Sequence, residues 1–184
     1  MCLIQPSDPP CHVCSQALSV PPEQNPNYRC NTSLLIDYCQ SDEKHSYILI
    51  DVGKTFREQV LRWFTFHKIP RVDSVMHGED YISLGFLFGE KSRVAYISDV
   101  SRFPASTEYV ISNAGAGQLD LLILDTLYKT LEAVKRLCPK RALLIGMTHE
   151  FDHYKDNDFL MEWSKREGIP VQLAHDGMRV PIEL

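Results

Sequence analysis

The sequence has no long hydrophobic run, no large excess of either charge and no internal repeat. Its apolar stretches fall short of the roughly 20 residues that a membrane-spanning helix requires, so we expect no membrane partner. The formal net charge of −5 argues against a protein that coats nucleic acid, and nucleic acid is therefore not an expected partner. The opening residues 1–4 are too short for a signal peptide, which predicts a cytoplasmic location.

The length of 184 residues predicts a single domain over residues 1–184, with an ordinary globular composition of 44% hydrophobic and 23% charged residues. A domain of this size buries about 70% of the surface of its unfolded chain, so it can fold without disulfides. Prolines crowd the Cys/Pro-rich segment 1–30, and we expect this segment to be irregular.

Beyond residue 30, strand-like and helix-like stretches alternate, with hairpins in the first half. This alternation predicts an α/β layered domain with a mixed sheet. Helices are expected over residues 55–67, 130–137 and 158–167, the last ended by Gly168. Strands are expected over residues 33–38, 46–51, 72–75, 81–88, 93–98, 119–124, 142–147, 171–174 and 178–182.

The segment His149-Glu150-Phe151-Asp152-His153 matches the HExxH pattern, in which two histidines one helical turn apart bind zinc. Here the motif follows the apolar run 142–147, which is typical of a buried strand, and the next helix is expected only near Asn157. We therefore interpret His149 as a ligand at a strand end, where α/β folds open into ligand-binding crevices. A helical zinc protease is the other interpretation, and it predicts a helix through 149–153.

The segment Cys11-His12-Val13-Cys14 places two thiols at CxxC spacing. In a reducing compartment this spacing is more often a metal clip than a disulfide, because both thiolates can reach one tetrahedral zinc ion. One CxxC supplies half of such a site. A redox pair stays open as the alternative.

Four of the expected strands end in a residue that can bind a metal ion or support its ligands, namely Asp51, His77, Asp99 and His149. The same pattern includes the segments Asn31-Thr32-Ser33, Leu124-Asp125-Thr126 and Asp176-Gly177-Met178. Together these features resemble the metallo-β-lactamase superfamily, and most of all its PhnP-type phosphodiesterases. The resemblance spans nearly the whole chain. It implies an αββα sandwich with mixed sheets, whose strand-end loops hold two metal ions.

The resemblance also implies roles for single residues. His77 would be a ligand of one metal ion, Asp99 would bridge both ions, and His149 would be a ligand of the second. Asp51 would support the site from below, and Asp51 and His149 are the expected catalytic residues. Two divalent ions lower the pKa of a shared water and stabilise charge on a phosphodiester. The implied reaction is therefore metal-assisted hydrolysis of a small or nucleotide-like phosphodiester.

In PhnP-like proteins a cysteine cluster near the N-terminus builds a separate structural zinc site with a histidine that follows the last metal-binding histidine by four residues. The corresponding residues in this sequence are Cys2, Cys11, Cys14 and His153. The resemblance thus implies two catalytic zinc ions, for which manganese is the alternative metal, and one structural zinc ion.

The chain departs from the family pattern in that it lacks the HxHxDH motif. In the family this motif follows the strand that ends here near Val75, but in this sequence Val75 is followed directly by Met76 and His77. The expected sandwich is therefore incomplete, and each ion would have fewer than the three protein ligands of an ordinary catalytic zinc. Two interpretations stay open: a metal-dependent phosphodiesterase, or a catalytically inactive, zinc-stapled isoform or pseudoenzyme with a binding role. Two further questions stay open. The protein could form a homodimer, and the 184 residues could be pieces of a longer protein.

Overall fold

The computed structural model describes residues 11–76, 84–100, 102–112, 115, 117–126 and 129–183. The chain separates into two compact units. Among the described residues, the first unit holds 30–76, and the second holds 11–29 together with those from 84 onward. No helix within these described ranges is long and apolar enough to cross a membrane.

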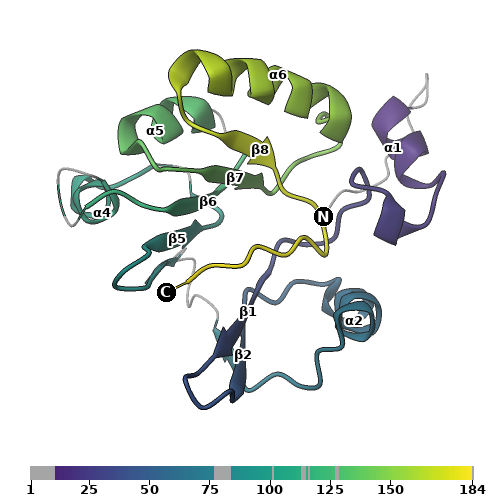
Figure 1. The fold of residues 1–184 in the computed structure, drawn as a ribbon. Coiled ribbons are helices and arrows are strands. Elements are labelled where there is room, and N and C mark those ends of the chain that lie inside the picture. The colour runs from purple at the N-terminus through teal and green to yellow at the C-terminus, as the bar shows by residue number, and fades with distance from the viewer. Residues whose placement is uncertain are drawn as a thin grey trace. The chain divides into compact units, whose positions relative to one another are not determined.

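The first unit contains a three-stranded sheet with the order β1-β2-β3, of which Figure 1 labels β1 and β2. β1 (Leu34–Cys39) and β2 (His45–Ile50) form an antiparallel hairpin in which Leu34 pairs with Ile50. β3 (Ser74–Met76) pairs with β2 in parallel. The connection from β2 to β3 is helical and consists of α2 (Phe56–Gln59), the π-helical turn η2 (Val60–Phe64) and α3 (Thr65–His67).

The second unit contains a five-stranded sheet with the order β4-β5-β6-β7-β8. β4 pairs with β5 antiparallel, and each later pair of neighbours is parallel. Every residue of β5, β6 and β7 is buried, as expected for strands of a parallel sheet that carry apolar side chains on both faces. The strands are β4 (Gly85–Phe88), β5 (Val94–Ile97), β6 (Leu121–Asp125), β7 (Ala142–Ile145) and β8 (Val171–Leu173).

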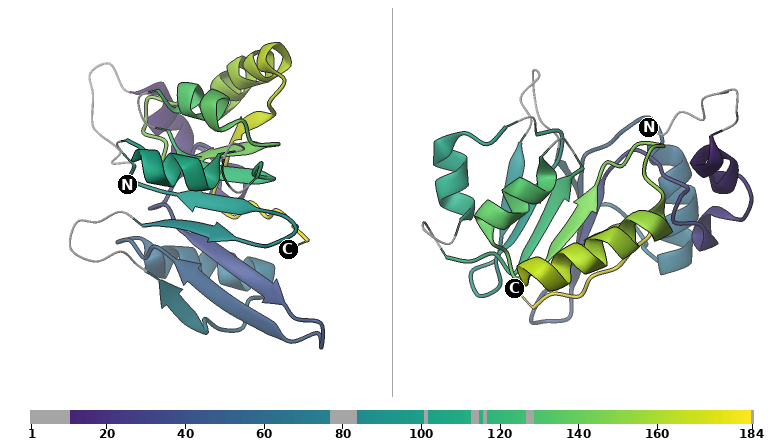
Figure 2. Two further views of the ribbon diagram at one scale, coloured as in Figure 1. Left: turned by 90° about the vertical axis from the view of Figure 1, so that its left-hand side faces the viewer. Right: turned by 90° about the horizontal axis from the view of Figure 1, so that it is seen from above.

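Three helices, α4 (Ala105–Ile111), α5 (Thr130–Leu137) and α6 (His153–Glu167), connect the successive parallel strands. They cover one face of the sheet (Figure 2), because right-handed crossovers between strands in sequential order return to the same side. The core of the unit lies on that face. Its strand members include Leu124, Leu144 and Leu173, which are neighbours across the sheet, and its helix members include Ile111, Val134 and Trp163.

Several sequence predictions are confirmed. The α/β class with mixed sheets is correct, since both sheets contain parallel and antiparallel pairs. The first hairpin lies within one residue of its expected position, and α5 has the expected bounds. α6 ends at Gly168, whose positive φ of 74° is the left-handed conformation expected of a glycine cap. α5 ends instead at the exposed Cys138, which has a φ of 48°.

The start of α6 differs from the prediction. The helix begins at His153 rather than near Asp158, because the Asp152 carboxylate accepts the backbone N–H groups of Tyr154 and Lys155 and caps the first turn. His149 precedes the helix. The interpretation of HExxH as a helical zinc protease motif is therefore wrong.

Three other predictions are wrong in detail. The segment 11–30 contains α1 (His12–Ala17) and a 3-10 turn (Pro22–Gln24) rather than being irregular throughout. The helix α4 was not expected, although Pro104 directly before it is a usual helix-start signal. Residues 178–182 form no strand within the described part of the chain.

Candidate metal site

The strands β5 and β6 run parallel, so their carboxyl ends lie at one edge of the sheet of the second unit. Asp99 follows β5 with a φ of 51°, and Asp125 is the last residue of β6 and only 6% exposed. The backbone N–H of Asp99 donates to Oδ2 of Asp125. The two strand ends are therefore joined through a buried carboxylate, and that bond fixes the backbone that carries the Asp99 side chain.

Gly146 lets the chain leave the next strand, β7, close to the same carboxylate. Its φ is +69°, and a Cβ built on it would lie 1.8 Å from Oδ1 of Asp125. A residue with a side chain would thus face both a left-handed backbone and a steric clash. Asp125 was not predicted as a site residue, although its place at the end of an apolar strand is the signal by which Asp99 was found.

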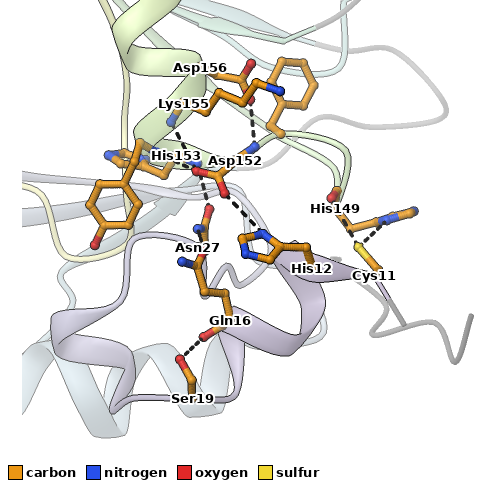
Figure 3. A network of polar contacts seen from close by, with 12 residues as sticks. Cys11, His12, Gln16, Ser19, Asn27, His149, Asp152, His153, Lys155 and Asp156 are labelled. Atoms are coloured by element: carbon orange, nitrogen blue, oxygen red, sulfur yellow. Dashed lines mark hydrogen bonds and ion pairs between the residues drawn. The ribbon is translucent and has the colours of Figure 1, made fainter. Parts of the chain in front are cut away.

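His149 lies in the loop between β7 and α6, and its imidazole faces the N-terminal segment (Figure 3). The Sγ atom of Cys11 is 3.6 Å from Nδ1 of His149. With Sγ of Cys14, these atoms form a group in which all ligand atoms lie within 4.8 Å of one another. The structure therefore brings together three of the predicted metal-binding residues.

The donor set of this group suits zinc. A tetrahedral zinc ion with bonds of roughly 2.3 Å to sulfur and 2.0 Å to nitrogen holds those two ligand atoms about 3.5 Å apart. The separation of 3.6 Å between Sγ of Cys11 and Nδ1 of His149 is close to this distance. The pKa of the Cys11 thiol is lowered to about 7, first by the backbone N–H of Cys14 and next by the His149 side chain. A lowered pKa favours the thiolate, which is the form that binds a metal ion.

His153, which was predicted as the histidine of the cysteine site, lies elsewhere. It is the first residue of α6 and 9% exposed, and its ring centroid is 5.9 Å from that of His175. Within the described residues its Nδ1 atom is buried without a hydrogen-bond partner. Burial, followed by the nearby His175 and Arg29, lowers its pKa to about 4. The contacts thus group the cysteine pair with His149, and the predicted four-ligand set stays a prediction.

The other predicted ligands are placed as follows. Asp51 belongs to the first unit, directly after β2, where its φ is 61° and its backbone N–H donates to the carbonyl of Met76 over 3.0 Å. Cys2 and His77 lie outside the described residues. The hydrolytic set of Asp51, His77, Asp99 and His149 therefore also stays a prediction.

No family model matches the sequence, and no curated protein matches it either. Among solved structures, the chain is similar to a crystal structure described as a new diphosphatase from the PhnP family. The TM-score is 0.64 at 20% sequence identity, and the match covers 95% of this chain and 90% of the other. This similarity establishes a common fold.

Proposed function

We propose that this protein is a metal-dependent hydrolase that cleaves the phosphodiester bond of a small or nucleotide-like substrate. The observation that carries the proposal is the similarity of fold to a PhnP-family diphosphatase over 95% of the chain. A second observation supports it: the chain has a group of thiol and imidazole side chains that suits a metal ion.

In this proposal His77 and His149 bind the hydrolytic metal ions, Asp99 bridges them and Asp51 supports them. Zinc or manganese at such a site supplies an activated water and stabilises charge on the phosphate. Asp99 is suited to its role because Asp125 holds its backbone N–H, so its position depends on a buried strand end rather than on a free loop.

The proposal includes a structural zinc ion on Cys2, Cys11, Cys14 and His153. The contact of Cys11 with His149 favours a second arrangement, in which His149 is the histidine of the cysteine site. Cobalt(II) as a spectroscopic substitute for zinc distinguishes the two. If His149 is the ligand, His149→Ala weakens the thiolate-to-cobalt absorption and His153→Ala leaves it intact, whereas the first arrangement gives the opposite result.

Hydrolysis is tested on the full chain, stripped of metal and then reloaded with zinc or manganese, with bis(p-nitrophenyl) phosphate as substrate. We expect turnover that depends on the metal and is lost in Asp99→Asn. Asp158→Asn is the matched control, because Asp158 is an exposed carboxylate on α6 and its loss should leave turnover unchanged.

A folded, metal-loaded chain without turnover would overturn the proposal. It would favour the alternative of a catalytically inactive, zinc-stapled isoform or pseudoenzyme with a binding role. The cytoplasmic location and the homodimer stay predictions, which cell fractionation and light scattering test directly.

A further inference from the structure

One guanidinium group of the N-terminal segment contacts the backbone of the loop that carries His149. Nη1 of Arg29 donates to the carbonyl of Thr148 over 2.7 Å, and Nη2 donates to the carbonyl of Phe151 over 2.9 Å. These two carbonyls flank His149 and Glu150. Arg29 therefore holds the backbone of the loop on both sides of the imidazole.

A buried amide orients the guanidinium. Asn27 has no exposed surface, and its Oδ1 accepts from Nη2 of Arg29 over 3.1 Å and from the backbone N–H of His153 over 2.8 Å. Its Nδ2 donates to Oε1 of Gln16 over 2.7 Å (Figure 3). Asn27 thus links the N-terminal segment, Arg29 and the first residue of α6.

The loop has weak hydrogen bonds of its own. The backbone N–H of Phe151 reaches the carbonyl of Thr148 over 3.3 Å, and the backbone N–H of Glu150 reaches Oγ1 of Thr148 over 3.4 Å. Both distances are long for hydrogen bonds. Bonds from a charged donor are shorter and about twice as strong, so the Arg29 contacts have the larger part in fixing this backbone.

We propose that Arg29 is a positioning residue for His149 and acts through the backbone carbonyls of Thr148 and Phe151. It sets the direction of the imidazole, and so its capacity to bind a metal ion at the cysteine pair or at the hydrolytic site. The inference rests on the metal binding contained in the proposed function, and it does not depend on hydrolysis. A lysine at this position cannot replace arginine, because a single ammonium group does not match two separated acceptors in a fixed fork.

The test compares the full-length chain with Arg29→Ala and Arg29→Lys. Cobalt(II) is titrated and its absorption recorded, and hydrogen exchange of the amides of residues 149–151 is followed in the same samples. We expect both variants to bind cobalt roughly 10- to 100-fold more weakly, the usual effect of losing a residue that orients a ligand. Their loop amides should also exchange faster. Guanidinium ion, added far below unfolding concentrations, should restore affinity to Arg29→Ala.

Asn157→Ala is the matched control. Asn157 lies on α6 and, like Arg29, bonds to backbone, since its Oδ1 accepts from the N–H of Leu173 over 2.8 Å. This contact lies outside the loop of residues 146–152. This variant should lose stability and keep its cobalt affinity.

The proposal is overturned if the Arg29 variants keep the parent affinity and loop exchange. It is also overturned if Asn157→Ala weakens cobalt binding as much and guanidinium restores nothing, or if the parent chain binds no cobalt. A parent that lacks hydrolysis but shows the Arg29 effect contradicts the proposed function alone. Hydrolysis without an Arg29 effect contradicts this inference alone.

Discussion

The two ends of the loop between β7 and α6 are held in place by different kinds of interaction. At the sheet, Gly146 passes Asp125 so closely that backbone conformation and steric contact fix the chain. At the helix, side chains from residues 11–29 fix it by hydrogen bonds, chiefly from Asn27 and Arg29.

This difference indicates how each end should respond to change. A steric constraint does not depend on pH and fails abruptly when atoms are added. A polar constraint fails when a partner is removed or its protonation changes, because buried groups are then left unpaired. His149 lies between the two ends, so both constraints act on the same imidazole.

The largest effect is expected at the sheet end. Gly146→Ala combines a left-handed backbone with a clash against Asp125, and we expect it to lower the free energy of unfolding by about 3 kcal/mol or more. Gly168→Ala is the control, since Gly168 has a similar φ of +74° but open space around it, and it should cost about 1 kcal/mol. Urea unfolding measures both. Equal losses would show that the close approach to Asp125 is not a constraint.

The helix end should be sensitive to Asn27. Asn27→Ala leaves the buried N–H of His153 and the part-buried Oε1 of Gln16 without their partner, which should cost about 2 to 3 kcal/mol. Asn27→Asp keeps the acceptor for His153 and should cost less. The same unfolding experiment ranks the two variants, and a larger loss in Asn27→Asp would mean that a buried carboxylate facing Oε1 of Gln16 costs more than the bond to His153 contributes.

The contribution of the helix end to the free energy of unfolding should depend on pH. In the folded chain His153 has a pKa of about 4, below the ordinary histidine value of 6.5, so the unfolded chain binds more protons between these pH values. The contribution of neutral His153 is complete above pH 6.5 and is lost as the pH falls towards 4. In metal-free protein we expect a loss of at most about 2 kcal/mol at pH 5. His153→Asn should flatten the profile over this range, and an unchanged slope would assign it to other groups.

The smallest losses of stability are expected for Asp152, which caps α6, and for its exposed partner His12. Asp152→Ala removes the acceptor for the N–H groups of Tyr154 and Lys155 and should cost about 1 kcal/mol. The ion pair of Asp152 with the exposed His12, at 3.7 Å, should add little, so His12→Ala should cost less than about 0.5 kcal/mol. Thermal unfolding distinguishes them. Because Asp152→Ala removes the same ion pair as well as the cap, a larger loss in His12→Ala would show that His12 stabilises the chain through other contacts.

Local patterns predicted the parts of the fold that local chemistry determines. The amphipathic stretch of α5 and the glycine at 168 each contain the information for their own structure. The cap at Asp152 was also present in the sequence, as was the Asp156 carboxylate that accepts the backbone N–H of Asp152.

The grouping of the candidate site was less predictable. Cys11 and His149 are 138 positions apart, so no spacing rule relates them, and their contact is known only from the fold. The choice of His149 rather than His153 beside the cysteine pair depends on where α6 begins. Asn27 and Arg29 belong to no motif, and their hydrogen bonds to residues 148–153 are known only from the fold.

Cys138 has a practical consequence for handling the protein. It ends α5 in a left-handed conformation that costs a residue other than glycine about 1 kcal/mol, and its thiol is exposed to solvent and to oxidants. Replacing it with glycine would relieve the torsional cost. The same replacement would remove an exposed thiol that can form intermolecular disulfides, and it would leave the cysteines beside His149 untouched.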